Sequence, residues 1–128
     1  CSIAQHAALA ALEGPRRHIV ERREAIRRRL AAVVAALDAA EGLSCPTPEG
    51  AFYVFPSCAG AIGRTSEGGA RIEDDAAFCA ALLEETGVAT VPGAAFGASP
   101  HFRISYALDD AALAEAGARI ARFCAGLR

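Results

Sequence analysis

Residues 101–106 read His101-Phe102-Arg103-Ile104-Ser105-Tyr106, and apolar and polar side chains alternate strictly along them. An alternation with a period of two predicts a β-strand that carries Phe102, Ile104 and Tyr106 on one face. Arg103 then lies on the opposite face, between two polar neighbours. Its planar guanidinium presents a fork of N–H donors that matches a carboxylate. The residues alone leave three partners open: a carboxylate of the same fold, the carboxylate of a bound substrate, or water at an edge strand.

Sequence signals on both sides of this strand predict a small α+β domain. A glycine-containing loop leads into the strand and reads Val91-Pro92-Gly93-Ala94-Ala95-Phe96-Gly97. The other predicted elements, in chain order, are a helix at residues 2–12, a long helix from Gly14-Pro15 to about Ala40, a strand at 50–55, a flexible surface loop at 57–73, a helix from Asp74 or Asp75 to Thr86, a strand at 88–91 and a last helix after Asp109. This order predicts an open sheet of about three strands with helices packed on it.

The two amino-terminal helices carry specific expectations. Ser2 and Gln5 have capping-box spacing, and Pro15 suits the first turn of the long helix. The apolar stripe of that long helix consists of Ile19, Ile26, Leu30, Val33 and Leu37. Seven of the thirteen basic residues fall between Arg16 and Arg29, a density that is typical of a solvated helix face. A helix this long in so small a domain is expected to bridge two bodies.

Composition narrows the function classes. With 53% apolar and 22% charged residues, the 128-residue chain is globular, and a net charge of −2 gives no reason to expect nucleic acid. No apolar run reaches the roughly 20 residues of a membrane span. The five cysteines form no CxxC pair and no ligand spacing with histidine, which indicates reduced thiols in a cytoplasmic protein and no metal site.

All thirteen basic residues are arginine, and the chain contains no lysine. Chemistry that needs a Schiff-base amine or a phosphate-binding lysine therefore cannot be completed by this chain's own side chains. The chain also opens at Cys1 without an initiator methionine, from which we expect a fragment of a longer protein.

Three segments resemble pyridoxal-phosphate-dependent aminotransferases of fold type I, classes I and II. The loop and strand from Val88 to Ala107 are similar to the carboxy-terminal signature of that family. Pro48-Glu49-Gly50-Ala51-Phe52-Tyr53 resembles a strand of bacterial aspartate aminotransferases, and so does the arginine-rich helix after Gly14-Pro15. The resemblance extends over essentially all 128 residues.

The resemblance implies a role for several residues. Arg103 corresponds to the arginine that binds the α-carboxylate of the amino-acid or 2-oxo-acid substrate. Phe52 matches a position that lines the substrate pocket, although core packing remains open for it. Tyr53, Gly93 and Phe96 are expected to shape the site.

The resemblance also implies what lies outside the chain. The Schiff-base lysine and the groups that bind pyridoxal phosphate belong to a large domain, so no catalytic or cofactor-binding residue is assigned here. Residues 1–12 are expected to be a remnant of that domain, and residues 13–128 the small domain that closes over the active site. By family likeness, the full-length enzyme is expected to be a homodimer of the aspartate/2-oxoglutarate type, and the fragment alone is expected to be inactive.

Two other functions remain open from the residues. A free-standing regulatory module could bind an amino acid through the same arginine without a cofactor. A structural or dimerisation piece could use the arginine-rich helix as its contact surface.

Overall fold

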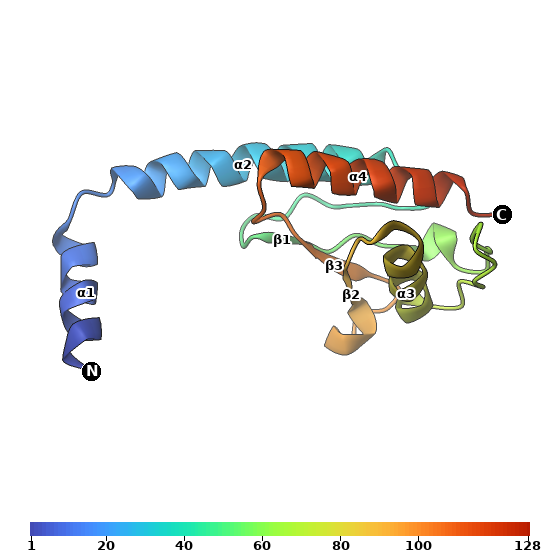
Figure 1. The fold of residues 1–128 in the computed structure, drawn as a ribbon, viewed down its shortest axis with the longest axis horizontal. Helices are drawn as coiled ribbons and strands as arrows, with labels where there is room; N and C mark the ends of the chain where they lie inside the picture. The colour runs from blue at the N-terminus through green and yellow to red at the C-terminus, as the bar shows by residue number, and fades with distance from the viewer.

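The computed structural model describes residues 1–128 and has the predicted α+β architecture, with a three-stranded sheet and helices against it (Figure 1). Its elements are α1 (Ser2–Glu13), α2 (Arg17–Asp38), β1 (Tyr53–Val54), the 3-10 helix η1 (Ala59–Ala61), α3 (Asp75–Thr86), β2 (Val91–Pro92), the 3-10 helix η2 (Gly93–Phe96), β3 (Phe102–Ser105) and α4 (Asp110–Ala125).

The arginine-bearing strand, β3, lies in the middle of the sheet, in the order β1-β3-β2. Both neighbours pair with it antiparallel, Val54 opposite Ile104 and Val91 opposite Arg103. The predicted alternation is confirmed, because Phe102, Ile104 and Tyr106 are buried while the residues between them are partly exposed. The central position of β3 also shows that the edge-strand alternative for Arg103 is wrong.

The outer strands are shorter than the predicted ranges 50–55 and 88–91. Backbone pairing with the 101–106 segment nevertheless continues past β1, since Tyr106 N–H donates to the Phe52 carbonyl and Phe102 N–H to the Pro56 carbonyl, both at 3.0 Å. Regular strand geometry stops before Phe52, because Ala51 has a φ of +67°. β2 ends at Pro92, which has no N–H to extend a ladder.

The hydrophobic core lies between the sheet and the helices. Phe78 of α3 is central to it, with ring centroids 5.0 Å from Phe102 and 5.6 Å from Phe123. The inward face of α4 consists of Leu113, Ile120 and Phe123, and the following Leu127 is also buried. The predicted range of α3 is confirmed: Asp74 caps its start by accepting from Ala77 N–H at 2.8 Å, and the helix ends at Thr86, before Gly87 with a φ of +72°.

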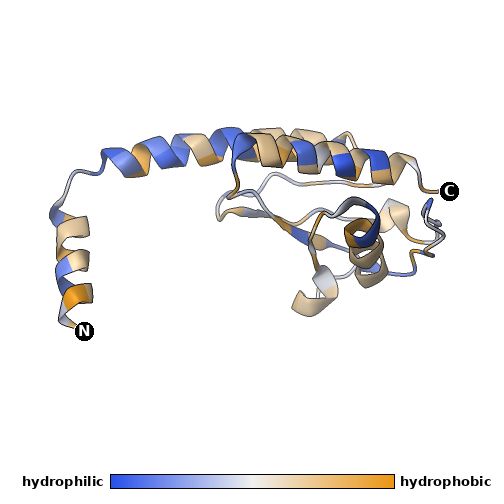
Figure 2. Ribbon diagram, in the orientation of Figure 1, coloured by the Kyte–Doolittle hydropathy of each residue, from blue (hydrophilic) through white to orange (hydrophobic).

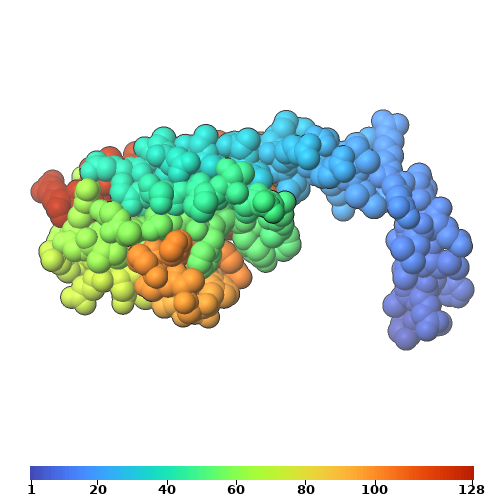
Figure 3. Space-filling view, turned by 180° about the vertical axis from the view of Figure 1, so that it is seen from behind, coloured from blue at the N-terminus to red at the C-terminus, as the bar shows by residue number.

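The long helix α2 packs only along its second half, where Val33 and Leu37 are buried beside α4. Ile19, the first member of the predicted stripe, is 51% exposed. Figure 3 shows why: α1 and the first turns of α2 extend away from the rest of the chain. Pro15 also lies before α2 instead of in its first turn, because the helix is capped at Arg16.

Helix α1 has no buried residue, and Ile3 on it is 79% exposed. In Figure 2 the ribbon of α1 is largely coloured as hydrophobic, and no other element lies beside it. The predicted capping box is wrong, since the helix begins at Ser2 itself and its N-cap, Cys1, makes no side-chain hydrogen bond. None of the helices combines the length and the apolar character needed to cross a membrane.

The segment at residues 57–73 is not a loose surface insertion. Ala61 and Ile72 are fully buried within the core. Thr65 and Arg128 exchange two backbone hydrogen bonds, of 2.7 and 3.0 Å, which tie the segment to the carboxy-terminal end. Glycines are needed for the turns of a flexible surface loop and for those of a packed irregular segment. The sequence pattern therefore did not distinguish these two kinds of segment.

Candidate functional site

The guanidinium of Arg103 lies between two aromatic rings. Its central carbon is 4.6 Å from the centroid of Tyr53 and 4.8 Å from that of Phe96. β3 carries the arginine, β1 the tyrosine and η2 the phenylalanine. Such cation–π contacts hold a guanidinium by its faces and leave the N–H groups at its edge available.

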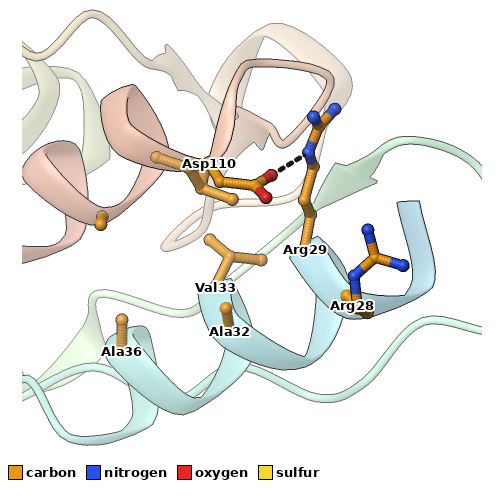
Figure 4. A pocket seen from close by; sticks show the side chains of 8 residues that line it. Arg28, Arg29, Ala32, Val33, Ala36 and Asp110 are labelled. Carbon is orange, nitrogen blue, oxygen red and sulfur yellow. Dashed lines mark hydrogen bonds and ion pairs between the residues drawn. The ribbon is translucent and has the colours of Figure 1, made fainter. Parts of the chain in front are cut away.

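Arg103 takes part in none of the ion pairs and none of the side-chain hydrogen bonds of the structure. No carboxylate of the same fold therefore neutralises it, which removes the first of the three partners left open by the sequence. Arg29 provides the contrast, because its Nε lies 2.5 Å from the Asp110 carboxylate across the α2–α4 contact (Figure 4). The Arg29 hydrogen bond and charge lower the pKa of Asp110.

A small hollow of about 170 Å³ opens beside Arg103, with walls formed by Tyr53, Thr90, Val91 and Ser105. A second hollow of about 300 Å³ lies between α2 and α4, and it is the one drawn in Figure 4. There the arginine closest to α4, Arg29, already has its carboxylate partner. The hollow at Arg103 is therefore the candidate carboxylate-binding site.

The glycine loop can approach this strand closely only because residue 93 is glycine. Gly93 is buried and donates to the His101 carbonyl at 2.7 Å. A Cβ atom at this position would lie 2.6 Å from the same oxygen and closer still to the Ala98 carbonyl. Gly97 then takes a left-handed conformation with a φ of +68°. The two glycines thus set where Phe96 stands relative to Arg103.

Asp75, the first residue of α3, contacts the glycine loop next to this site, whereas the sequence predicted only a helix cap at Asp74 or Asp75. It is 1% exposed, and it accepts hydrogen bonds from Ala94 N–H at 2.7 Å and from the Ser99 hydroxyl. Burial acts to raise the pKa of Asp75, but the hydrogen bonds from Ser99 and Ala94 outweigh it and lower the pKa below its ordinary value. The available signal was the pair Asp74-Asp75: only one residue caps α3, which leaves the other for a different task.

Phe52 lies at the rim of the site. The residue is 45% exposed, and its ring packs on that of Tyr53 with centroids 4.2 Å apart, whereas the cation–π contacts of Arg103 are with Tyr53 and Phe96. The preceding Ala51 is held by the buried Tyr106, whose hydroxyl donates to the Ala51 carbonyl at 2.9 Å. The structure therefore brings Arg103, Tyr53 and Phe96 together, while Phe52 contacts the tyrosine ring.

The fold and the sequence comparisons define the class of protein. The chain belongs to the aminotransferase class I and II family, whose model matches residues 1–120. Among curated relatives, it is 63% identical over 127 residues to the aspartate/prephenate aminotransferase of Cereibacter sphaeroides. The aligned region covers 99% of this chain and 32% of that protein. It is 54% identical over 123 residues to the aspartate aminotransferase of Rhizobium meliloti, and that aligned region covers 96% of this chain and 30% of that protein.

Solved structures agree with this assignment. The crystal structure of the aspartate aminotransferase from Rhizobium meliloti matches 99% of the chain and 32% of its own length, with a TM-score of 0.96 and 52% identity. An alanine aminotransferase from Pyrococcus furiosus matches 95% of the chain and 29% of its own length, with a TM-score of 0.84 and 30% identity. The chain thus spans about a third of the length of the relatives it matches.

The family implies pyridoxal phosphate in its full-length enzymes. The residues of this chain do not fit as the holder of that group, because the bond to the cofactor requires a lysine and the chain has none. The hollow beside Arg103 is therefore a candidate site for a carboxylate, and no residue of this chain is assigned to the cofactor.

Proposed function

We propose that this chain is the small carboxy-terminal domain of a pyridoxal-phosphate-dependent aminotransferase. In this proposal residues 13–128 form the domain that closes over the active site, and residues 1–12 belong to the large cofactor-binding domain. Two observations support the division: α1 buries no residue against the rest of the chain, and the chain spans about a third of its relatives. Helix α2 would then connect the two bodies.

The proposed task of Arg103 is to bind the α-carboxylate of the amino-acid or 2-oxo-acid substrate. The observation that carries this proposal is a half-buried guanidinium with aromatic rings on its faces and no ionic partner. A carboxylate can dock edge-on with two parallel N–H···O bonds, and the rings restrict rotation of the fork. The substrate is then oriented before any bond changes, which is where much of the rate enhancement of a two-reactant step arises.

The proposed substrates are aspartate and related acids, because the similar proteins carry the names aspartate and aspartate/prephenate aminotransferase. The cofactor, when bound elsewhere in the full-length enzyme, supplies the electron sink for the reaction at the α-carbon. This chain contributes carboxylate binding and, by closing, exclusion of water. A homodimer in the cytoplasm is part of the same proposal.

The test is the substitution of Arg103 in the full-length enzyme that contains this chain. Arg103→Ala removes a charge-assisted bidentate contact. The resulting fall in kcat/KM should correspond to a loss of about 3 kcal/mol of transition-state stabilisation. Arg103→Lys should recover only part of that loss, because an ammonium has no planar fork. Arg71→Ala is the control, since Arg71 is exposed and distant in sequence from the site. Unchanged turnover of aspartate by Arg103→Ala would refute the assigned role.

A regulatory module is the second candidate, because the unpaired Arg103 and its hollow are complete within the chain itself. Calorimetry of the isolated chain with aspartate or glutamate separates the two functions. Tight binding favours the module, whereas an absence of heat favours an incomplete enzyme. Stable visible absorbance together with turnover, after pyridoxal phosphate is added to the isolated chain, would contradict the proposal that the chain is inactive alone.

A further inference from the structure

We propose that Asp75 is a positioning residue for the substrate carboxylate: it fastens the glycine loop to α3 so that Phe96 stays against the guanidinium of Arg103. This inference rests on the proposed function of Arg103 and adds a residue to it. Asp75 itself touches neither the arginine nor the hollow beside it.

The contacts run in a continuous sequence from α3 to the arginine. Asp75 is the first residue of α3, a helix anchored in the core by the fully buried Phe78 and Leu82. One of its carboxylate oxygens accepts from Ala94 N–H within η2, and the other accepts from the Ser99 hydroxyl beyond the end of η2. Phe96 lies between these two attachment points.

The remaining hydrogen bonds of the loop do not reach α3. Gly97 N–H donates to Ala94 and Ala98 N–H donates to Gly93, so both bonds are internal to the loop. Gly93 N–H donates to His101, which attaches only the beginning of the loop to the sheet side. Asp75 is therefore the side chain that fixes the position of the loop relative to the helix.

A carboxylate suits this task better than other side chains. It offers acceptors on two oxygens, so one residue can hold two donors that are five positions apart in the chain. Hydrogen bonds to a charged acceptor are stronger than neutral ones. Such bonds are also needed to compensate for the burial of the charge, since Asp75 is almost completely inaccessible to water.

The expected functional consequence is a change in substrate binding. If the loop shifts, Phe96 leaves one face of the guanidinium, and the fork can rotate away from the orientation that a carboxylate needs. A displacement of the order of an ångström at such a site can cost up to about 100-fold in rate. The loss should appear mainly in KM, because the reacting groups themselves remain in place.

The test compares neighbouring aspartates of one helix in the full-length enzyme. We expect Asp75→Ala to raise the KM for aspartate by about 10- to 100-fold, with a smaller fall in kcat. Asp74→Ala is the matched control: it removes the cap of the same helix, a bond to Ala77 N–H, without touching the loop. Asp75→Asn should recover part of the loss, since its carbonyl oxygen can still accept from Ala94 N–H and its amide can donate to the Ser99 oxygen.

A double-mutant cycle decides whether the effect passes through the arginine. In an Arg103→Ala background, adding Asp75→Ala should change kcat/KM by less than about twofold, because the group being positioned is gone. Equal effects of Asp75→Ala with and without Arg103 would overturn the inference, and so would equal KM changes for Asp74→Ala and Asp75→Ala.

Two further outcomes are informative. If Asp75→Ala does not fold, Ser99→Ala removes one of the two attachments at an exposed residue and should still raise KM several-fold, while an unchanged KM counts against the inference. If Arg103→Ala alone leaves turnover unchanged, the proposed function fails. If Arg103→Ala lowers kcat/KM as expected but Asp75→Ala leaves KM unchanged, only the inference about Asp75 fails.

Discussion

The ring of Tyr53 lies against the guanidinium of Arg103 although the two residues are not direct partners in the sheet. Tyr53 pairs with Ser105, two residues further along β3, so the contact with Arg103 is a diagonal one across the β1–β3 pair. Diagonal neighbours on one face of an antiparallel sheet are about 7–8 Å apart, which long side chains can span. The register of the sheet, and not proximity along the chain, therefore places Tyr53 as one wall of the candidate site.

The aromatic rings should contribute measurably to substrate binding. Phe96→Leu and Tyr53→Leu each remove a cation–π contact worth about 0.5–1 kcal/mol, so the KM of the full-length enzyme should rise about two- to fivefold. Tyr53→Phe keeps the ring and serves as the control, with little change expected. Steady-state kinetics with aspartate measure the effect. An unchanged KM in both leucine variants would show that the rings do not preorganise the arginine.

Gly93 should not tolerate a side chain. The Cβ atom of Gly93→Ala would meet the carbonyl oxygens of Ala98 and His101, so we expect a loss of about 1–3 kcal/mol in the free energy of unfolding. Gly50→Ala is the matched control, because nothing lies within 4 Å of a Cβ atom there. Urea unfolding of the chain compares the two. Equal midpoints would contradict the close approach of the loop to the sheet.

Helix α1 should be dispensable for the stability of the rest of the chain. Because it buries no residue, removal of residues 1–13 should leave the denaturant midpoint unchanged. Removal of Leu127 and Arg128 at the other end should lower it, since Leu127 is buried and Arg128 exchanges backbone hydrogen bonds with Thr65. A marked destabilisation by the amino-terminal deletion would show that α1 packs on the domain.

The cysteines should differ sharply in reactivity. Burial raises the pKa of Cys58 and of Cys124 to about 12 and that of Cys45 to about 11, so these thiols carry almost no thiolate at neutral pH. Cys1 is exposed. Titration with a thiol reagent should therefore modify one thiol quickly in the folded chain and all five after denaturation. Rapid reaction of several thiols under native conditions would contradict the burial.

Asp75 should also affect stability in acid. Its pKa in the folded chain lies below the ordinary value of 3.8, so between these two values the unfolded chain binds more protons. The stabilisation from the carboxylate is thus present above about pH 4 and is lost as the pH falls through the lower, folded-state pKa. Asp75→Asn lacks this dependence. Urea unfolding at several pH values should show a difference between the two proteins that shrinks in acid, and a constant difference would refute it.

Local patterns in the sequence determined much of the fold. The alternation at 101–106 predicted which side chains of β3 face the core, and Asp74 and Asp109 marked the starts of two helices that the structure confirms. Local patterns failed where the burial of a side chain depends on whether another element of the chain packs against it. The stripe that begins at Ile19 has helical spacing, but its first part contacts nothing within the chain.

The sequence by itself determined the strand that bears Arg103, the absence of lysine and the resemblance to aminotransferases, because each depends on residue types at short spacing. Only the tertiary structure decided that Arg103 has no carboxylate partner, that Tyr53 and Phe96 cover it, and that Asp75 holds the loop. These relationships join residues that lie far apart in the chain. They follow from how the sheet, the helices and the loop pack together, and packing of that kind leaves no periodic trace in the sequence.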